Sequence, residues 1–337
     1  MVWINHIWFG KNKKVLVLNS DFVKEAYRGI LGRDPESQQV IDSHIRRHAT
    51  VSSLLSTLVH SPEFKKMENP KARNDAVMAA LSEAYWSKPG AIEFDVSKEA
   101  MRRLVSRIRD QWTVLGETEP HWSVLTNDQY RSDKIDEEAI ADFYQSGEHS
   151  ARLIDLFEQR TGVSARHGVC LELGCGVGRV TEHLAKRFER VIGVDISPGN
   201  LKLCKERMAK VGIHNVETQV VGGMEDFDSL PNFDFFYSII VLQHNSPPIQ
   251  KAMLRCLLGK VKRGGGALFQ IPTEMPGYSF EVEPYLATAA PTMEVHGLPK
   301  SVILDEIRRA GLNLVDVMPD SWTDILGSYT FYAVKPE

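Results

Sequence analysis

The chain has 337 residues, of which 43% are hydrophobic and 25% charged, so it is long enough for two domains and has the composition of a folded globular protein. With 40 basic and 44 acidic residues its formal charge is -4, which excludes a broad electrostatic attraction to nucleic acid or to an anionic membrane surface.

Neither the first residues nor the cysteines indicate export. MVWINHIWFGKNKK is apolar but too short to span a bilayer, and no small-residue cleavage site follows it. The four cysteines, Cys170, Cys175, Cys204 and Cys256, have none of the spacings of a zinc site. We therefore expect reduced thiols in a cytoplasmic protein, with no transmembrane segment and no required metal.

Amphipathic helices are expected first, between residues 21 and 65. One begins at Asp21 and ends before Gly32 and Pro35, a second begins at Ser37, and a third runs from Val51 into HSPEF. The segments FVKEAYRGILGRDP and LVHSPEF resemble a small helical domain of unknown function found in bacterial proteins that handle surface polysaccharides. This resemblance implies an auxiliary domain over residues 1–68 that binds a protein or glycan partner. An ordinary helical bundle is the alternative.

Residues 69–128 are interpreted as a helical linker region. KMENPKARND is polar, and a helix is expected through residues 76–85. From Ser97 the apolar residues recur at helical spacing, at Met101, Leu104, Val105, Ile108 and Trp112. Trp112 and Trp122 could wedge this region against the next domain or line a substrate cleft. Packing is favoured for Trp112, and the role of Trp122 stays open.

Two helices are expected between residues 135 and 162, joined near Ser146 and Gly147. They precede VCLELGCGVGRVTEHLAKRF, residues 169–188, in which a short apolar run breaks into glycines and then shows a helical stripe. This pattern predicts a strand buried in a parallel sheet, a glycine turn and a helix that lies on the sheet, with a ligand-sized gap at the turn.

The residues around the glycine turn favour one nucleotide ligand over another. The dinucleotide fingerprint has a third glycine where Arg179 stands, and Glu172 would place a carboxylate beside a pyrophosphate. The same carboxylate suits S-adenosylmethionine (SAM), whose methionine end carries an ammonium and a sulfonium. Asp195 ends the next apolar strand, where a carboxylate can accept two hydrogen bonds from ribose hydroxyls.

Glu172, the glycines and Asp195 together resemble motif I and the following acidic motif of class I SAM-dependent methyltransferases. The resemblance extends over about residues 130–335 and implies SAM as cofactor, S-adenosylhomocysteine (SAH) as product and a catalytic domain at residues 129–337. It also implies an α/β fold with a Rossmann-like seven-stranded sheet, mostly parallel with the last strand antiparallel, after the N-terminal all-α domain. A turn that binds no ligand is the alternative.

The resemblance also assigns residues to the cofactor. In this family the helices before the first strand fold over the cofactor as a lid, although Tyr144 could equally be a core residue. After the third strand, Gly223 stands where an acid is common, so the adenine is assigned to Met224, Glu225 and Asp226 as a group. The residues expected to bind the cofactor are Tyr144, Ser146, Gly147, Glu172, Gly174, Cys175, Gly176, Gly178, Arg179, Asp195, Ile196, Gly223, Met224, Glu225, Val241 and Gln243.

Strands and helices alternate beyond Asp195. A helix begins at Ser197 and Pro198, the third strand lies in VETQVV, the fourth in FDFFYSII, and the fifth enters from a glycine-rich turn in GGGALFQIP. A helix over residues 302–310 and an antiparallel pair near 312–317 and 329–334 complete the domain. The long segment TEMPGYSFEVEPYLATAAPTMEVHG is expected to be a substrate-binding insertion.

Two histidines are candidates for a general base. His244 follows the fourth strand, where open α/β sheets place ligands, and imidazole titrates near neutrality. His296 lies in the long insertion with Tyr278, Tyr285 and Glu283, a mixture that suits a sugar. In the rival interpretation His244 only hydrogen-bonds a loop.

These features predict transfer of a methyl group to a sugar hydroxyl of a bacterial glycan or glycosylated metabolite. A small natural product or a protein side chain is the alternative acceptor, and a SAM-binding scaffold or sensor is the non-enzymatic alternative. Nucleic acid is disfavoured as acceptor by the charge balance and because VLQH, rather than an NPPY-type tetrapeptide, follows the fourth strand.

Overall fold

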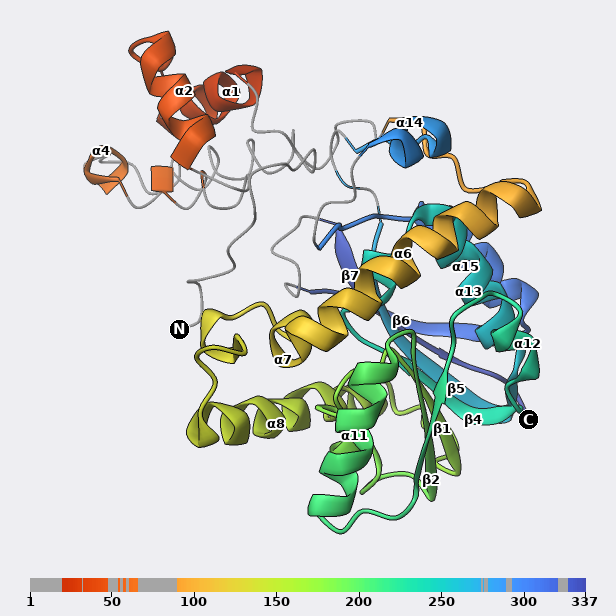
Figure 1. The fold of residues 1–337 in the computed structure, drawn as a ribbon. Coiled ribbons are helices and arrows are strands. Elements are labelled where there is room, and N and C mark those ends of the chain that lie inside the picture. The colour runs from red at the N-terminus through yellow and green to blue at the C-terminus, as the bar shows by residue number, and fades with distance from the viewer. Residues whose placement is uncertain are drawn as a thin grey trace.

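A central sheet with helices on both faces organises the molecule (Figure 1). The computed structural model describes residues 20–31, 33–47, 54, 57–58, 61–65, 90–273, 275, 278–288, 293–320 and 327–337. Within them the sheet has seven strands in the order β3-β2-β1-β4-β5-β7-β6. Their bounds are β1 Val169–Leu173, β2 Arg190–Asp195, β3 Val216–Val220, β4 Phe233–Ser238, β5 Val261–Pro272, β6 Asn313–Pro319 and β7 Ser328–Val334.

The pairing of the strands confirms the expected fold. Strands β1 to β5 pair in parallel, and β7 lies antiparallel between β5 and β6. The central strands β1 and β4 are almost entirely buried, as their apolar runs predicted. Because the strands are parallel, β1, β2 and β4 all end at one edge of the sheet, and their carboxyl ends lie side by side there.

Alternating side chains of β4 divide the core into two layers. Phe236 contributes to the core under α6, α13 and α15, whereas Phe235 and Tyr237 contribute to the core under α9 and α10. The helices around the sheet are α6 Lys98–Thr118, α7 Pro120–Val124, η1 Asp128–Tyr130, α8 Glu137–Ala151, α9 Leu153–Thr161, α10 Thr181–Leu184, α11 Pro198–Lys210, α12 Asp226–Ser229, η2 Leu242–His244, α13 Pro247–Gly259, α14 Val282–Ala287 and α15 Lys300–Arg309.

The helix expected to break at Ser146 and Gly147 is continuous through both residues. Helix α8 runs to Ala151, and Arg152 separates it from α9. Gly147 is needed for close packing instead of a turn, since a Cβ atom built there would lie 1.9 Å from the carbonyl oxygen of Arg179. The prediction of a joint at this glycine was therefore wrong.

Two further boundaries differ from the sequence prediction. The helix after the glycine turn, α10, is only one turn long, because beyond Leu184 the backbone bonds include i→i−3 contacts that tighten the chain. Strand β5 begins at Val261, so the three glycines lie inside it rather than before it. Gly264 has φ +72, and the β4–β5 register shifts between Phe233 and Phe235, which indicates a bulge at this point.

The N-terminal helices are partly described. Helices α1 Ser20–Leu31 and α2 Gln38–Arg47 contact each other, and Arg33 forms an ion pair of 2.6 Å with Glu63 of α4 Pro62–Lys65. Most of the expected third helix and the helix over residues 76–85 lie outside the described residues. The division of the chain at residues 68 and 128 stays a prediction.

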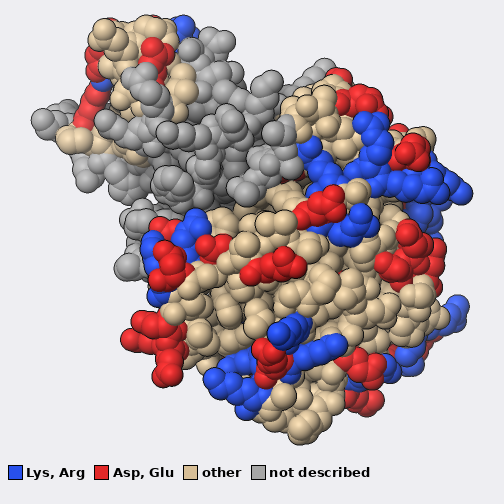
Figure 2. Space-filling view, viewed as in Figure 1, with Lys and Arg blue, Asp and Glu red and all other residues tan. Residues whose placement is uncertain are grey.

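Helix α6 belongs to the core of the sheet. Its first turn is capped by Ser97, whose hydroxyl accepts from the amide of Ala100 at 3.1 Å, and Leu104 and Ile108 are buried against the sheet. None of the described helices is both long enough and apolar enough to cross a membrane. On the viewed face, acidic and basic side chains are interspersed around a broad uncharged middle (Figure 2).

Candidate active site

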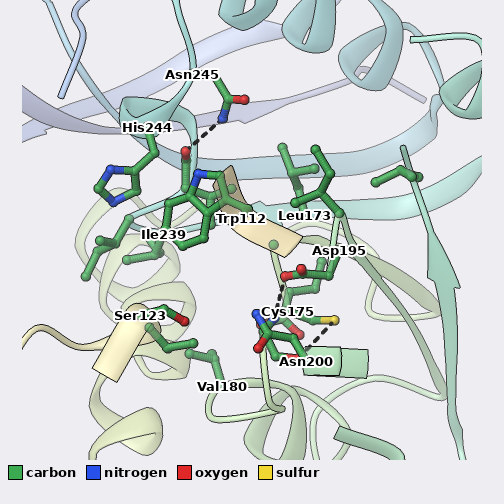
Figure 3. A pocket seen from close by; sticks show the side chains of 18 of the residues that line it. Trp112, Ser123, Leu173, Cys175, Val180, Asp195, Asn200, Ile239, His244 and Asn245 are labelled. Atoms are coloured by element: carbon green, nitrogen blue, oxygen red, sulfur yellow. Dashed lines mark hydrogen bonds between the residues drawn. The ribbon is translucent and has the colours of Figure 1, made fainter. Parts of the chain in front are cut away.

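A pocket lies at the carboxyl ends of β1, β2 and β4, beneath α6 and α7 (Figure 3). About 920 Å³ of empty space, part of it open to solvent, lies among its lining residues. Nine of the residues assigned from the sequence line it: Glu172, Gly174, Cys175, Gly176, Arg179, Asp195, Ile196, Val241 and His244.

The glycine turn forms the floor of the pocket. Gly174, Gly176 and Gly178 all have positive φ, so the turn needs residues that reach the left-handed region without strain. The amide of Gly174 donates to the carbonyl oxygen of Val194 at 2.7 Å, which ties the turn to the end of β2. A Cβ atom at Gly174 would lie 2.4 Å from the Val241 side chain, so Val241 packs directly on the backbone of the turn and leaves no room for a side chain there.

Glu172 is a buried carboxylate at the wall of the pocket. It accepts a hydrogen bond of 2.7 Å from the hydroxyl of Thr181. Burial raises the pKa of Glu172 to about 7, with the Thr181 bond and the charge of Arg179 opposing that rise. A cation at the wall would favour the charged form, so the site suits the ammonium end of SAM.

Asp195 and Asn200 present acceptors from the next strand and helix. The carboxylate of Asp195 accepts from the amides of Gly176 at 2.9 Å and Ser197 at 2.8 Å, and burial raises its pKa. Bonds from the Asn200 side chain and the Ile196 amide also favour its charged form. Asn200 also lines the pocket, and its buried Oδ1 has no hydrogen-bond partner in the structure. This orphaned acceptor fits a donor on a bound nucleoside.

The residues expected to form a lid support the turn from behind. Arg179 donates to the hydroxyls of Ser146 and Ser150, each at 3.3 Å. The Tyr144 hydroxyl donates to the carbonyl oxygen of Val177 at 3.2 Å. Tyr144, Ser146, Gly147 and Gly178 are not among the residues that line the pocket. Their assignment to the cofactor stays a prediction.

The residues assigned to adenine lie beside the pocket. After β3, Val221 lines it, whereas Gly223, Met224 and Glu225 do not. The amide of Gly223 donates to Asp226 at 2.9 Å, which fixes this loop. The role of these three residues also stays a prediction.

His244 lies in η2 at the mouth of the pocket (Figure 3). Its Nδ1 lies 2.7 Å from the backbone carbonyl oxygen of Glu294, and a carbonyl oxygen only accepts, so Nδ1 carries the hydrogen. In the neutral ring Nε2 is then the acceptor, and it lies 3.2 Å from the side-chain nitrogen of Gln243. Gln243 is buried and does not itself line the pocket.

Trp112, Ser123 and Val124 close the pocket from α6 and α7. The Trp112 ring lies 5.2 Å from the His244 ring, so this residue is both packed and part of the wall. Trp122 instead stacks under Arg131 at 4.2 Å. Periodicity marked Trp112 as apolar but could not show which sheet edge α6 would cross.

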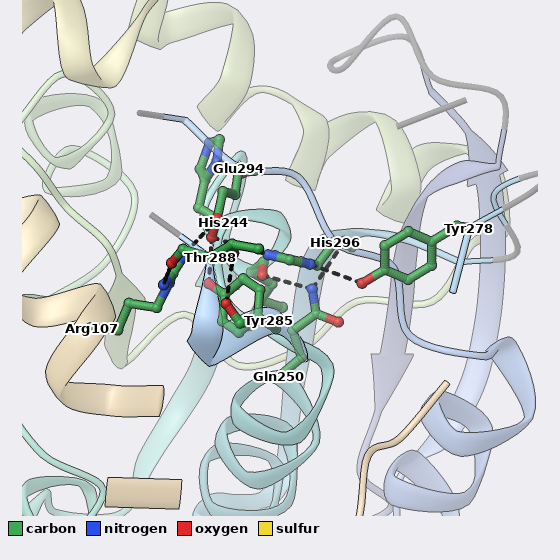
Figure 4. Close-up of polar contacts among 9 residues, drawn as sticks. Arg107, His244, Gln250, Tyr278, Tyr285, Thr288, Glu294 and His296 are labelled. Atoms are coloured by element: carbon green, nitrogen blue, oxygen red, sulfur yellow. Dashed lines mark hydrogen bonds and ion pairs between the residues drawn. The ribbon is translucent and has the colours of Figure 1, made fainter. Parts of the chain in front are cut away.

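A buried polar cluster lies behind His244 (Figure 4). The carboxylate of Glu294 accepts from Tyr285 and lies 3.2 Å from Arg107 and 3.4 Å from His296. Burial opposes ionisation of Glu294, but bonds from His296 and Tyr285 outweigh it, so its pKa is lowered. Tyr278 completes the cluster, 2.8 Å from Nδ1 of His296.

His296 therefore lies in this cluster and not among the pocket residues. Tyr278 and Tyr285 are engaged with it, and Glu283 is exposed and paired with Arg103. The described part of the insertion holds His244 in place through the Glu294 carbonyl group, and its aromatic rings face inwards.

Comparison with known proteins finds a family match over the residues that form the pocket. Residues 170–265 match a protein family described as "Methyltransferase domain". This match covers the glycine turn, Asp195 and His244, the residues around which the pocket is built. The chain carries a SAM-dependent methyltransferase domain. Its cofactor is SAM.

Relatives of this methyltransferase domain differ in what they act on. The chain is 38% identical over 76 residues to a tRNA/tmRNA (uracil-C(5))-methyltransferase of a Nitratiruptor species, a match that spans 20% of this chain and 21% of that relative. It is 24% identical over 184 residues to a ubiquinone biosynthesis O-methyltransferase of Pseudomonas fluorescens, over 52% of this chain and 77% of the relative.

Among solved structures, magnesium protoporphyrin IX methyltransferase from Synechocystis PCC 6803 with bound SAH is similar, with a TM-score of 0.47 and 18% identity. The match covers 68% of this chain and 98% of that one.

Proposed function

We propose that this enzyme transfers the methyl group of SAM to a hydroxyl of a sugar, in a bacterial glycan or glycosylated metabolite, with His244 as the general base. The observation that carries the proposal is the fixed tautomer of His244. Its Nδ1 hydrogen is committed to the Glu294 carbonyl oxygen, so Nε2 is the accepting nitrogen of the ring, where an acceptor hydroxyl would replace the Gln243 side-chain nitrogen that lies 3.2 Å away. A hydroxyl needs such an acceptor, because its proton must leave as the new bond forms.

The proposed reaction is an in-line displacement. SAM, when bound, supplies a methyl group on a positively charged sulfur, which departs as a neutral thioether. The acceptor oxygen forms a bond to the methyl carbon, the sulfur–methyl bond breaks, and the hydroxyl proton passes to Nε2 of His244. Glu172 and Asp195 would hold the ammonium and the ribose, and Asn200 offers a further acceptor. Alignment of this kind can contribute about 7–11 kcal/mol.

The wall beside His244 supports a ring-shaped acceptor. Trp112 offers an aromatic face within the pocket, and the apolar faces of sugars stack on such rings. The N-terminal helices, by their resemblance to a module of polysaccharide-handling proteins, add a reason to favour a glycan. We propose that they bind a glycan or protein partner.

A second acceptor class is favoured by a specific observation. Ile239, Val180 and Met253 make much of the remaining wall apolar. Such a wall also suits the hydroxyl of an apolar ring, and the relatives include a ubiquinone biosynthesis O-methyltransferase. In both acceptor classes, sugar hydroxyls and hydroxyls of apolar rings, His244 would remove the hydroxyl proton. The classes differ in how many hydrogen bonds the acceptor needs from the pocket.

The experiment is incubation of the purified enzyme with isotope-labelled SAM and separate pools of nucleotide sugars, cell-envelope saccharides and phenolic extracts. Mass spectrometry and NMR then locate the labelled methyl. A methyl on a sugar oxygen supports the first class and one on a phenolic oxygen the second. A methyl on nitrogen, carbon or a carboxylate would reject the proposed hydroxyl chemistry.

A further inference from the structure

Ile240, directly after β4, has an unusual backbone conformation. Its φ is +63, and among the described residues other than glycine only Met293 shares a positive φ. In this left-handed region the Cβ atom crowds the following carbonyl oxygen, and β-branching makes the crowding worse. Conformations of this kind persist only where surrounding contacts determine them.

The side chain of Gln270 supplies such a contact. Gln270 lies on β5 and is fully buried, and its Oε1 accepts from the amide of Ile240 at 3.0 Å. Its Nε2 donates to the hydroxyl of Ser328 at 2.8 Å. The Ser328 hydroxyl in turn donates to Asp320 at 2.6 Å. A chain of hydrogen bonds thus runs across the carboxyl edge of the sheet from Asp320 to the strained residue.

The strained turn determines where the next residue packs. Both Ile240 and Val241 line the pocket, and the Val241 side chain lies against the backbone of Gly174, the first glycine of the turn. The carbonyl oxygen of Val241 accepts from the amide of His244 at 3.1 Å and from Asn245 at 3.0 Å. A change in the Ile240 backbone would therefore displace Val241 from the glycine turn.

We propose that Gln270 is a positioning residue for the cofactor. It does not line the pocket. By holding the Ile240 amide it keeps the strained turn in the conformation that packs Val241 on Gly174, and so sets the affinity for SAM. Gln270 has no apolar substitute for this role, because only a side-chain acceptor can bind the buried amide.

The test is the dissociation constant for SAM, measured by calorimetry on the full chain, so no acceptor is needed and the outcome is independent of the proposed O-methylation. Gln270→Met keeps the length of the side chain and removes the acceptor. We expect it to weaken SAM binding at least tenfold in the native background. The same tenfold loss should appear when Gln270→Met is added to Ile240→Ala, in which strain remains.

Adding Gln270→Met to Ile240→Gly should weaken binding less than threefold, because glycine reaches φ +63 without strain and needs no support. The Ile240→Ala and Ile240→Gly backgrounds both lack the isoleucine side chain, so the main difference between them is how readily residue 240 adopts a positive φ. An equal loss in both backgrounds, or unchanged SAM affinity alongside a lower melting temperature, would overturn the proposal. If Gln270→Met does not fold, Ser328→Ala takes its place, and we expect it to weaken SAM binding about threefold in the Ile240→Ala background and not at all in the Ile240→Gly background. An equal loss of SAM affinity in both backgrounds, or no loss in either, would overturn the proposal.

Discussion

At the scale of single residues, Glu172 shows how burial prepares a site for a cation. Its carboxylate is enclosed at the pocket wall, and burial is the largest influence on its pKa, which lies at about 7. Burial therefore disfavours the ionised form of Glu172 in the absence of a bound cation. SAM brings an ammonium and a sulfonium, so in the proposed binding mode, with the ammonium at Glu172, its binding and the loss of the Glu172 proton are linked.

This linkage predicts a pH dependence of SAM affinity. Below pH 7 Glu172 is protonated in the free enzyme, and binding must remove that proton, so the dissociation constant should rise as pH falls, by up to about tenfold per unit. Above pH 7 the affinity should level off. Calorimetry between about pH 5.5 and 8 measures the profile. Glu172→Gln should bind more weakly and lose this slope, and an unchanged slope in that variant would contradict the assignment.

The sequence predicts those site residues that belong to a recognisable local pattern of strand and turn, and it misses those that only tertiary packing brings to the pocket. Glu172, the glycines and Asp195 were predicted because they lie within or at the ends of two recognisable strands, and the structure brings them into one pocket. Asn200 was missed, although it lies in the first turn of a helix whose start at Ser197 was predicted. The strain at Ile240 had no signal either, because an isoleucine after a strand does not indicate positive φ.

At the scale of elements, close contact between α8 and the glycine turn depends on one missing side chain. Gly147 lies inside α8, where glycine is otherwise unfavourable, and the Arg179 carbonyl oxygen occupies the space of its Cβ atom. Local sequence rules interpret a glycine between two helical patterns as a joint. Only the packing of α8 against the loop after β1 shows that it is a point of contact.

Gly147→Ala should therefore destabilise the protein. The new methyl group must push α8 away from a backbone atom, at a cost of about 1–3 kcal/mol. Gly259→Ala is the matched control, because a Cβ atom there meets nothing within 4 Å. Thermal or urea unfolding gives both values. Equal stability of the two variants would show that α8 does not rest on the loop as described.

The insertion after β5 is a second element whose role depends on tertiary contacts. Its mixture of two tyrosines, an acid and a histidine favoured direct substrate binding. In the structure Tyr278, Tyr285 and His296 meet in the Glu294 cluster behind His244, whereas the acid, Glu283, is exposed and pairs with Arg103. Arg107 of α6 joins that cluster at Glu294. A distant helix thus helps to place the proposed base, a contact that no local pattern could predict.

At the scale of the whole molecule, α6 is part of the catalytic core. Leu104 and Ile108 share the core of β1 and β2, and Trp112 lines the pocket. The chain just before α6 is also attached, because Ile92 forms a β-bridge with Phe280. The described helices before residue 66 contribute nothing to the pocket wall.

Two truncations test this arrangement. A fragment that begins at residue 90 keeps α6 and the bridge, and should bind SAM within about threefold of the full chain. A fragment that begins at residue 119 loses three buried apolar side chains, Leu104, Ile108 and Leu115. Each contributes roughly 1.5–3 kcal/mol, so this fragment should be unstable or bind far more weakly. Circular dichroism and calorimetry compare them. Equal binding by both fragments would show that α6 is dispensable.

The whole-molecule account combines a SAM pocket with a base at its mouth, and His244→Gln tests it most directly. This variant keeps a polar side chain but removes the imidazole that accepts the proton. Steady-state turnover with the identified acceptor should fall about 100- to 10,000-fold, the usual contribution of a positioned base. The dissociation constant for SAM, measured by calorimetry on the same sample, should stay within threefold. Full turnover by His244→Gln with intact SAM binding would contradict the account.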